Sequence, residues 1–316
     1  MLEFLDYPKL LGGFIFLLMG GELLVRGSLG LAQESRIPPV VVGLTVVAFG
    51  TSAPELMVSI ISALSGHPGI AVGNVVGSNI ANVLLVLGVP VLIYPIICDQ
   101  KGLTKQASLM IGMTILFIGL CVFEPITMID GIFLLLILFG FLFLTSRGAV
   151  VIPGLDNPED ELASDFRLPT YPLTITVMIL LGIIMLPLGA NLVVEGGAGL
   201  ARTWSVPDRV IGLSLIALGT SLPELSTTVM AALYRSSDVA IGNVIGSNLF
   251  NILAILGVTA IVTDIPVDPT FIEFDLWIML GTSIILWFFV LLKFTINKST
   301  GILFLLGYVT YLFAIY

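Results

Sequence analysis

Apolar residues gather along the chain into ten long stretches separated by short polar segments. Five stretches precede a polar segment rich in Pro, Asp and Glu at 147–170, and five follow it. A helix needs about 20 apolar residues to cross a bilayer. The pattern therefore predicts ten membrane-spanning helices, at about 9–32, 38–64, 70–96, 104–123, 127–146, 171–201, 208–233, 239–262, 273–294 and 299–316.

The composition agrees with a polytopic membrane protein. Of the 316 residues, 57% are hydrophobic and 10% are charged, whereas a soluble domain has about 45–50% apolar and about 25% charged residues. These values exclude a soluble enzyme, a disordered chain and a nucleic-acid binder. The sequence contains no phosphate loop and no nucleophilic triad, so neither an enzyme nor an ATP-driven pump is expected.

The Lys and Arg residues predict the orientation of the chain in a cell membrane. With the N-terminus outside, the cytoplasmic side receives eight of them and the outside receives three. Because cytoplasmic loops carry the excess of positive charge, we expect both termini outside and segment 147–170 in the cytoplasm.

A long internal repeat divides the chain into halves. Segment 41–89 aligns with segment 210–258 at an offset of 169 without a gap, and 24 of 49 positions are identical. The identities include Thr, Ser, Pro, Glu and Asn, which packing alone does not require. Five spans in each half place the copies in opposite orientations, as in transporters whose site lies at the midplane. The prediction is an all-α membrane protein with a five-helix repeat at 1–146, an acidic loop at 147–170 and an inverted repeat at 171–316.

Two glutamates stand at equivalent positions inside apolar spans. Glu55 and Glu224 have no Lys or Arg one helical turn away, and a carboxylate near the bilayer centre costs about 2.5–3.5 kcal/mol or more. Two such groups that meet in a low dielectric stay ionised only if a cation lies between them. We therefore predict a cation site, with two protonated structural acids as the alternative.

Prolines next to these acids predict broken helices. Pro54 and Pro223 remove a backbone donor and free the carbonyls around Gly50 and Gly219. Carbonyl and hydroxyl oxygens are hard ligands that suit Na⁺ and Ca²⁺. Polar side chains spaced four residues apart extend each acid into a stripe, formed by Thr51, Glu55 and Ser59 and by Thr220, Glu224 and Thr228.

The next span of each half carries a second polar stripe, formed by Asn74, Ser78 and Asn82 and by Asn243, Ser247 and Asn251. Glycines at Gly73 and Gly77, and at Gly242 and Gly246, let neighbouring helices approach closely. We expect these helices to press together around a polar core. For Asn74, Asn79, Asn243 and Asn248, a part in the site and plain interhelical hydrogen bonding are both open.

The duplicated motifs resemble the α-repeats of sodium/calcium exchangers of the cation/calcium antiporter superfamily, in its prokaryotic branch. The motifs are GTSAPE at 50–55, GTSLPE at 219–224, GNVVGSNIAN at 73–82 and GNVIGSNLFN at 242–251. The resemblance covers nearly the whole chain. It implies alternating access by sliding of the first span of each half against the rest.

The resemblance also implies a ligand set. Glu55 and Glu224 would bind both Ca²⁺ and Na⁺, and backbone oxygens of Thr51 and Thr220 would coordinate Ca²⁺. The flanking Na⁺ sites would be completed by Ser52, Ser78, Ser221 and Ser247 and by the carbonyls of Ala48 and Ala217, with Asn82 and Asn251 lining the centre.

These expectations combine into an antiporter that exchanges Na⁺ for Ca²⁺, without a cofactor, in the lipid bilayer and as a monomer. Some relatives have Asp where this chain has Asn251, and potassium-dependent members use that acid, so K⁺ independence is expected. One Ca²⁺ neutralises two glutamates, whereas three Na⁺ would leave about +1, which makes exchange electrogenic. A Ca²⁺/H⁺ exchanger of the same fold, a cation channel and a purely structural membrane protein are the alternatives.

Overall fold

A computed structural model describes residues 3–123, 125–148, 168–204 and 217–315. The first half contains α1 (Glu3–Ser35), α2 (Pro39–Val42), η1 (Gly43–Val47), α3 (Ala48–Thr51), α4 (Ala53–Leu64), α5 (Gly69–Ala81), η2 (Asn82–Val86), η3 (Pro90–Leu92), α6 (Leu103–Val122) and α7 (Met128–Gly148). The second half contains α8 (Pro172–Thr203), α10 (Ala217–Thr220), α11 (Leu222–Leu233), α12 (Ser237–Phe250), η5 (Asn251–Ile255), α13 (Leu256–Val262), η6 (Phe271–Asp275), α14 (Leu276–Leu291) and α15 (Lys298–Ile315).

The sequence repeat is reproduced as a repeat of local structure. Adding 169 to the bounds of α4 gives those of α11, and the same shift converts η2 into η5. Helix ends and irregular turns therefore follow from the duplicated residues.

The prediction of an all-helical membrane protein is confirmed. In the described ranges, eight helices are long and apolar enough to cross a membrane, or nine when one bent pair counts as a single span. Ten spans were expected. Residues 205–216, with which the span predicted at 208–233 begins, lie outside the described residues, as does most of the predicted acidic loop, 149–167.

The predicted helix break before Glu55 is also confirmed. Helix α3 ends at Thr51 and α4 begins at Ala53, with a bend of 41° between the helical segments on either side. Pro54 occupies the first turn of α4, where a missing N–H costs least. In the second half, α10 ends at Thr220 and α11 begins at Leu222, so the same break recurs.

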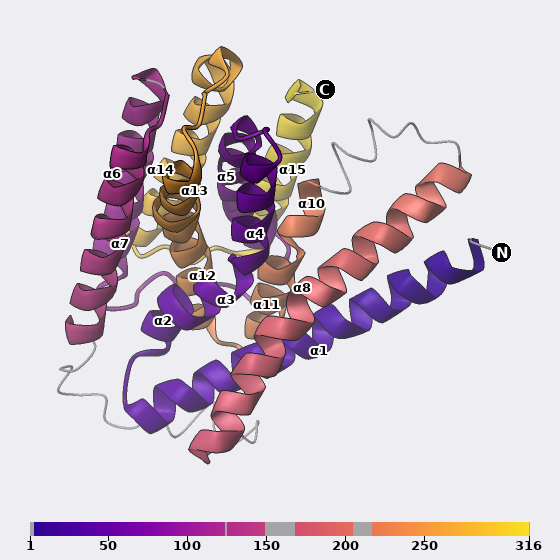
Figure 1. Ribbon diagram of the computed structural model, residues 1–316. Coiled ribbons are helices and arrows are strands. Elements are labelled where there is room, and N and C mark those ends of the chain that lie inside the picture. The colour runs from indigo at the N-terminus through magenta and orange to yellow at the C-terminus, as the bar shows by residue number, and fades with distance from the viewer. Residues whose placement is uncertain (1–2, 124, 149–167, 205–216, 316) are drawn as a thin grey trace.

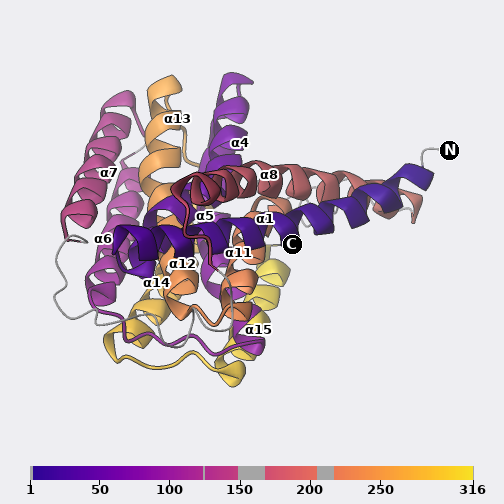
Figure 2. The same ribbon diagram turned by 90° about the horizontal axis from the view of Figure 1, so that it is seen from below.

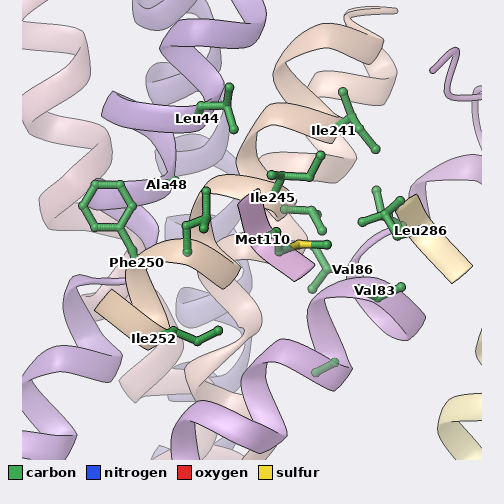
Figure 3. Close-up of a cluster of buried hydrophobic side chains, with 14 of the residues drawn as sticks. Leu44, Ala48, Val83, Val86, Met110, Ile241, Ile245, Phe250, Ile252 and Leu286 are labelled. Atoms are coloured by element: carbon green, nitrogen blue, oxygen red, sulfur yellow. The ribbon is translucent and has the colours of Figure 1, made fainter. Parts of the chain in front are cut away.

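Helices α5 and α12, with the segments that continue them, form the centre of the molecule (Figure 1). In the spans Gly69–Leu92 and Ser237–Val262, 78% and 83% of the scored residues are buried, against 17–39% in the other spans. Figure 3 shows part of the apolar core around them, where side chains such as Leu44, Met110 and Ile245 come together. The polar stripes of α5 and α12 therefore run through the middle of the bundle.

The two longest helices, α1 and α8, lie side by side and cross one side of the bundle (Figures 1 and 2). They run antiparallel, because Gly13 lies opposite Gly189 whereas Gly27 lies opposite Ile179. Glycines recur every seven residues on both contacting faces, at Gly13, Gly20 and Gly27 and at Gly182, Gly189 and Gly196. Small residues let two helices in a membrane approach closely. The sequence analysis did not identify this seam.

The α1–α8 seam predicts a sharp difference between two neighbouring glycines. A Cβ atom at Gly13 would lie 2.7 Å from the carbonyl oxygen of Gly189, whereas a Cβ at Gly12 meets nothing within 4 Å. We expect Gly13→Ala to lower the free energy of unfolding by about 1–3 kcal/mol through overpacking. Gly12→Ala should leave it unchanged or raise it slightly. Thermal unfolding in detergent measures both, and equal melting temperatures would contradict the close approach.

Candidate functional site

Two half-helices bring the predicted carboxylates into the bundle. Glu55 lies in the first turn of α4 and Glu224 in the first turn of α11, directly after the helix breaks. Each side chain is 1% exposed. The N-terminus of a helix carries a partial positive charge that favours a carboxylate. The two helix N-termini created by the breaks therefore offset part of the free-energy cost of burying a carboxylate in apolar surroundings.

The carboxylates of the two halves face a common position. Ser52 Oγ, at the first break, donates to Glu224 Oε1 across a distance of 3.3 Å, and the carboxyl groups of Glu55 and Glu224 interact electrostatically. Neither glutamate forms an ion pair within the described part of the chain. Like charges in a low dielectric repel strongly, so this pair needs either a proton or a cation.

Hydroxyl and amide oxygens surround the acids. The Thr51 hydroxyl lies 3.3 Å from Asn243 Oδ1 and 3.4 Å from Ser247 Oγ, both on α12. It also lies 3.3 Å from the carbonyl oxygen of Ala48, which accepts a second bond from the Ser52 amide. The geometry therefore joins the first half's break to the second half's polar stripe.

Asn74 and Asn243 act as braces between helices. Asn74 donates to Ser59 Oγ at 3.0 Å and to the carbonyl oxygen of Glu55 at 3.2 Å. Asn243 donates to Thr228 Oγ1 at 3.2 Å. The interhelical hydrogen bonding that was left open for these asparagines is confirmed. Because Asn243 also faces Thr51, the bracing and the site are parts of one network.

Four buried oxygen atoms at the centre have no hydrogen-bond partner. They are Glu55 Oε2, Glu224 Oε2, Asn82 Oδ1 and Asn251 Oδ1. All four are acceptors, and each half contributes an equivalent pair. Most buried polar atoms in folded proteins are hydrogen-bonded, and leaving them unpaired is costly. A set of unpaired acceptors without a donor is chemically matched to a cation.

The other predicted ligands lie on the same elements. Ser78, Ser221 and Ser247 are buried, Thr220 at the end of α10 is half-buried, and Ala48 and Ala217 begin α3 and α10. The structure thus places the predicted residues on the two broken helices and the two central helices. Whether each coordinates an ion remains a prediction.

The sequence analysis missed the backbone geometry at the centre. A π-helical turn begins at Asn82 and another begins at Asn251. Such turns insert one extra residue into a helix and often occur at functional sites. Here they end the regular part of α5 and α12 at the two asparagines whose oxygens are unpaired.

The described residues offer no second candidate for a cation site. No group of three or more His, Cys, Asp or Glu in the described ranges is placed to hold a metal ion, so a cation here would rely on two glutamates and neutral oxygens. A surface groove of about 740 Å³ lies between α2, α6 and α7, lined by residues such as Pro38, Lys101 and Phe141. Its lining contains no carboxylate.

Comparison with protein-family models identifies one match. Residues 9–147 and 174–316 match the family described as sodium/calcium exchanger protein. The match covers both halves and omits the segment between them.

Individual relatives cover the chain almost completely. The inner membrane protein YrbG of Escherichia coli (strain K12) is 32% identical over 97% of this chain and 95% of its own. The sodium/calcium exchanger MaX1 of Methanosarcina acetivorans is 30% identical over 98% of both chains. A solved structure of the sodium-calcium exchanger NCX_Mj, soaked with 10 mM Na⁺ and zero Ca²⁺, superposes with a TM-score of 0.83 at 31% identity over 98% of both chains.

The unpaired carboxylates predict an unusual stability effect. In cation-free, chelated buffer, Glu224→Gln should raise the free energy of unfolding, on the order of 1 kcal/mol, because it ends the repulsion between two buried carboxylates. A Ca²⁺ ion held by both carboxylates should stabilise the wild type and leave the variant unaffected, because a ligand that binds only the folded state stabilises it. Thermal unfolding with and without Ca²⁺ measures this. The exposed Glu273→Gln is the control, and a less stable Glu224→Gln would refute the prediction.

Proposed function

The chain belongs to the sodium/calcium exchanger protein family, and from this premise we propose that it is a secondary active antiporter exchanging Na⁺ for Ca²⁺. The exchange takes place by alternating access at one shared site in the middle of the membrane. Na⁺ moving down its gradient drives Ca²⁺ in the opposite direction.

One observation carries the proposal: four buried acceptor oxygens, an equivalent pair from each half, have no hydrogen-bond partner, and two of them belong to carboxyl groups. Ca²⁺ prefers six to eight oxygen ligands, including carboxylates and carbonyls. Two glutamates supply the charge that one Ca²⁺ neutralises. An empty site keeps two uncompensated charges, which hinders its passage between states and so favours exchange over leak.

We assign the ion ligands as follows. Glu55 and Glu224 bind both ions, and backbone oxygens of Thr51 and Thr220 complete the Ca²⁺ site. The Na⁺ sites lie beside it, and Asn82 and Asn251 line the centre. Burial of most of these side chains supports the assignment. The Na⁺ ligands are Ser52, Ser78, Ser221, Ser247 and the carbonyls of Ala48 and Ala217.

The proposed architecture has ten membrane spans in two inverted repeats, 1–146 and 171–316, joined by a cytoplasmic loop at 147–170. The antiparallel packing of the equivalent helices α1 and α8 supports the inversion. Both termini lie outside, and the monomer is the working unit. α1 and α8 slide against the rest of the bundle during transport.

We further propose that exchange is electrogenic and independent of K⁺. Three Na⁺ for one Ca²⁺ moves one net charge per cycle. The amide at Asn251 replaces the acid that potassium-coupled relatives carry, and the matching residue Asn82 is also an amide. The site therefore holds two negative charges.

Uptake of ⁴⁵Ca²⁺ into Na⁺-loaded proteoliposomes tests the function. We expect uptake that requires the outward Na⁺ gradient, persists when an ionophore clamps the pH, and is unaffected by K⁺. Glu55→Gln and Glu224→Gln should each reduce the rate at least about 100-fold, because one carboxylate cannot balance a divalent ion in a low dielectric. Glu273→Gln, whose side chain is exposed on η6, should transport normally.

The same assay separates the alternatives. Uptake that fails under the Na⁺ gradient and appears with an imposed pH gradient would replace the proposal with Ca²⁺/H⁺ exchange. Currents far above exchanger turnover would indicate a channel. Near-normal exchange in either glutamine variant would rule out the shared site.

Asn251→Asp tests the basis of K⁺ independence. A third carboxylate should make the transport rate depend on K⁺ or on pH, with a rate change of about 3-fold or more over a range where the wild type is flat. Thermal unfolding should show a folded variant. Glu273→Gln, whose side chain is exposed on η6, is the control and should keep the wild-type profiles. Identical K⁺ and pH profiles for the wild type and Asn251→Asp would contradict a central position for this residue.

A further inference from the structure

The side-chain amides at the centre of the site have a fixed direction. Asn82 Nδ2 donates to Asn248 Oδ1 at 3.0 Å, and Asn251 Nδ2 donates to Asn79 Oδ1 at 2.9 Å. An amide carries its oxygen on one side and its NH₂ on the other. Because the NH₂ groups are engaged with these partners, the oxygens of Asn82 and Asn251 are the atoms left unpaired at the site.

The partner asparagines are themselves oriented by sulfur atoms. Asn248 Nδ2 donates to Met110 Sδ at 3.5 Å, and Asn79 Nδ2 donates to Met279 Sδ at 3.8 Å. Asn79 Nδ2 also reaches the backbone oxygen of Asn248 at 3.4 Å. A thioether sulfur accepts hydrogen bonds and has no hydrogen to donate. The sulfur atom can therefore accept a hydrogen bond from the NH₂ group of each partner amide, but it cannot donate one to the amide oxygen.

We propose that Met110 and Met279 are positioning residues for the cation. Through Asn248 and Asn79, they hold the oxygens of Asn82 and Asn251 toward the ion. This inference rests on the proposed function, because it concerns the same site. If the chain of hydrogen bonds were reversed, the central asparagines would present N–H donors to a cation and weaken its binding.

Burial makes this orientation effective. Met110, Met279, Asn79 and Asn248 are at most 1% exposed. Met110 lies among the side chains of the apolar cluster around Ile245 and Val86 (Figure 3). An apolar side chain of equal volume at Met110 would remove the sulfur acceptor of Asn248 Nδ2, and one at Met279 would leave Asn79 Nδ2 with the backbone oxygen of Asn248 alone. Packing alone would make Met and Leu interchangeable here, which allows a test.

The test compares Met110→Leu and Met279→Leu with Met113→Leu. Met113 lies on the same helix as Met110 and packs against the same core. The readouts are the Ca²⁺ dependence of Na⁺-driven uptake, Ca²⁺ binding by calorimetry and the melting temperature. We expect each of the first two variants to raise the KM and Kd for Ca²⁺ about 3- to 10-fold, with Vmax and melting temperature nearly unchanged. Met113→Leu should match the wild type.

A double-mutant cycle then shows which asparagine each sulfur acts through. In an Asn82→Ala background, Met110→Leu should have no further effect on the KM, because the side chain that it orients is absent. Met279→Leu should keep its effect there, since it acts through Asn251. A residue that only fills the core would give additive effects in every combination.

The outcomes separate this inference from the proposed function. Wild-type Na⁺-driven Ca²⁺ uptake with an unchanged KM in Met110→Leu and Met279→Leu would overturn the positioning role and leave the antiporter intact. A lower Vmax and a lower melting temperature at an unchanged KM would also overturn the positioning role, because they would show that the methionines only fill the core. Wild-type protein that binds Ca²⁺ by calorimetry without Na⁺-driven uptake would overturn the antiporter, while the Kd values would still decide the inference.

Discussion

Two carboxyl groups buried inside an apolar bundle are the constraint on which the rest of the structure depends. Glu55 and Glu224 are almost completely buried and form no ion pair within the described part of the chain. The surrounding features compensate for them in part. The helix breaks place each carboxyl group in the first turn of a helix, and the Ser52 hydroxyl donates to one of them. The unpaired oxygens of Asn82 and Asn251 are acceptors and supply no compensation. The remaining compensation has to come from a cation or a proton.

The sequence predicts the parts of this arrangement that local chemistry determines. Pro54 removes a backbone donor next to Gly50 and so favours a break, and Glu55 follows it on the same turn, so both could be located without coordinates. The repeat adds their equivalents in the second half. The direction of the Asn82 amide could not be predicted in this way, because it depends on Asn248, a partner 166 residues away. The sulfur of Met110 is more remote still and looks like an ordinary core residue in the sequence.

Backbone irregularities escaped prediction for a different reason. A π-helical turn depends on a balance between one lost and one gained hydrogen bond, and no residue type marks it as Pro marks a break. The glycine seam between α1 and α8 was visible as a seven-residue spacing. The spacing alone does not identify the helix that packs against these glycines, so the contact between α1 and α8 could not be predicted from it. The structure supplies that partner.

The seam between α1 and α8 also has a consequence for the origin of the chain. Gly13 packs on Gly189 and Gly20 packs on Gly182. Adding 169 converts each of these contacts into the other, so the two repeats use the same positions. An interface built from one patch used twice is isologous, the kind that pairs identical subunits about a two-fold axis. A half-length ancestor with this face would already have been complementary to a second copy of itself. Fusing two such halves into one chain makes their bimolecular encounter intramolecular, at a high effective concentration.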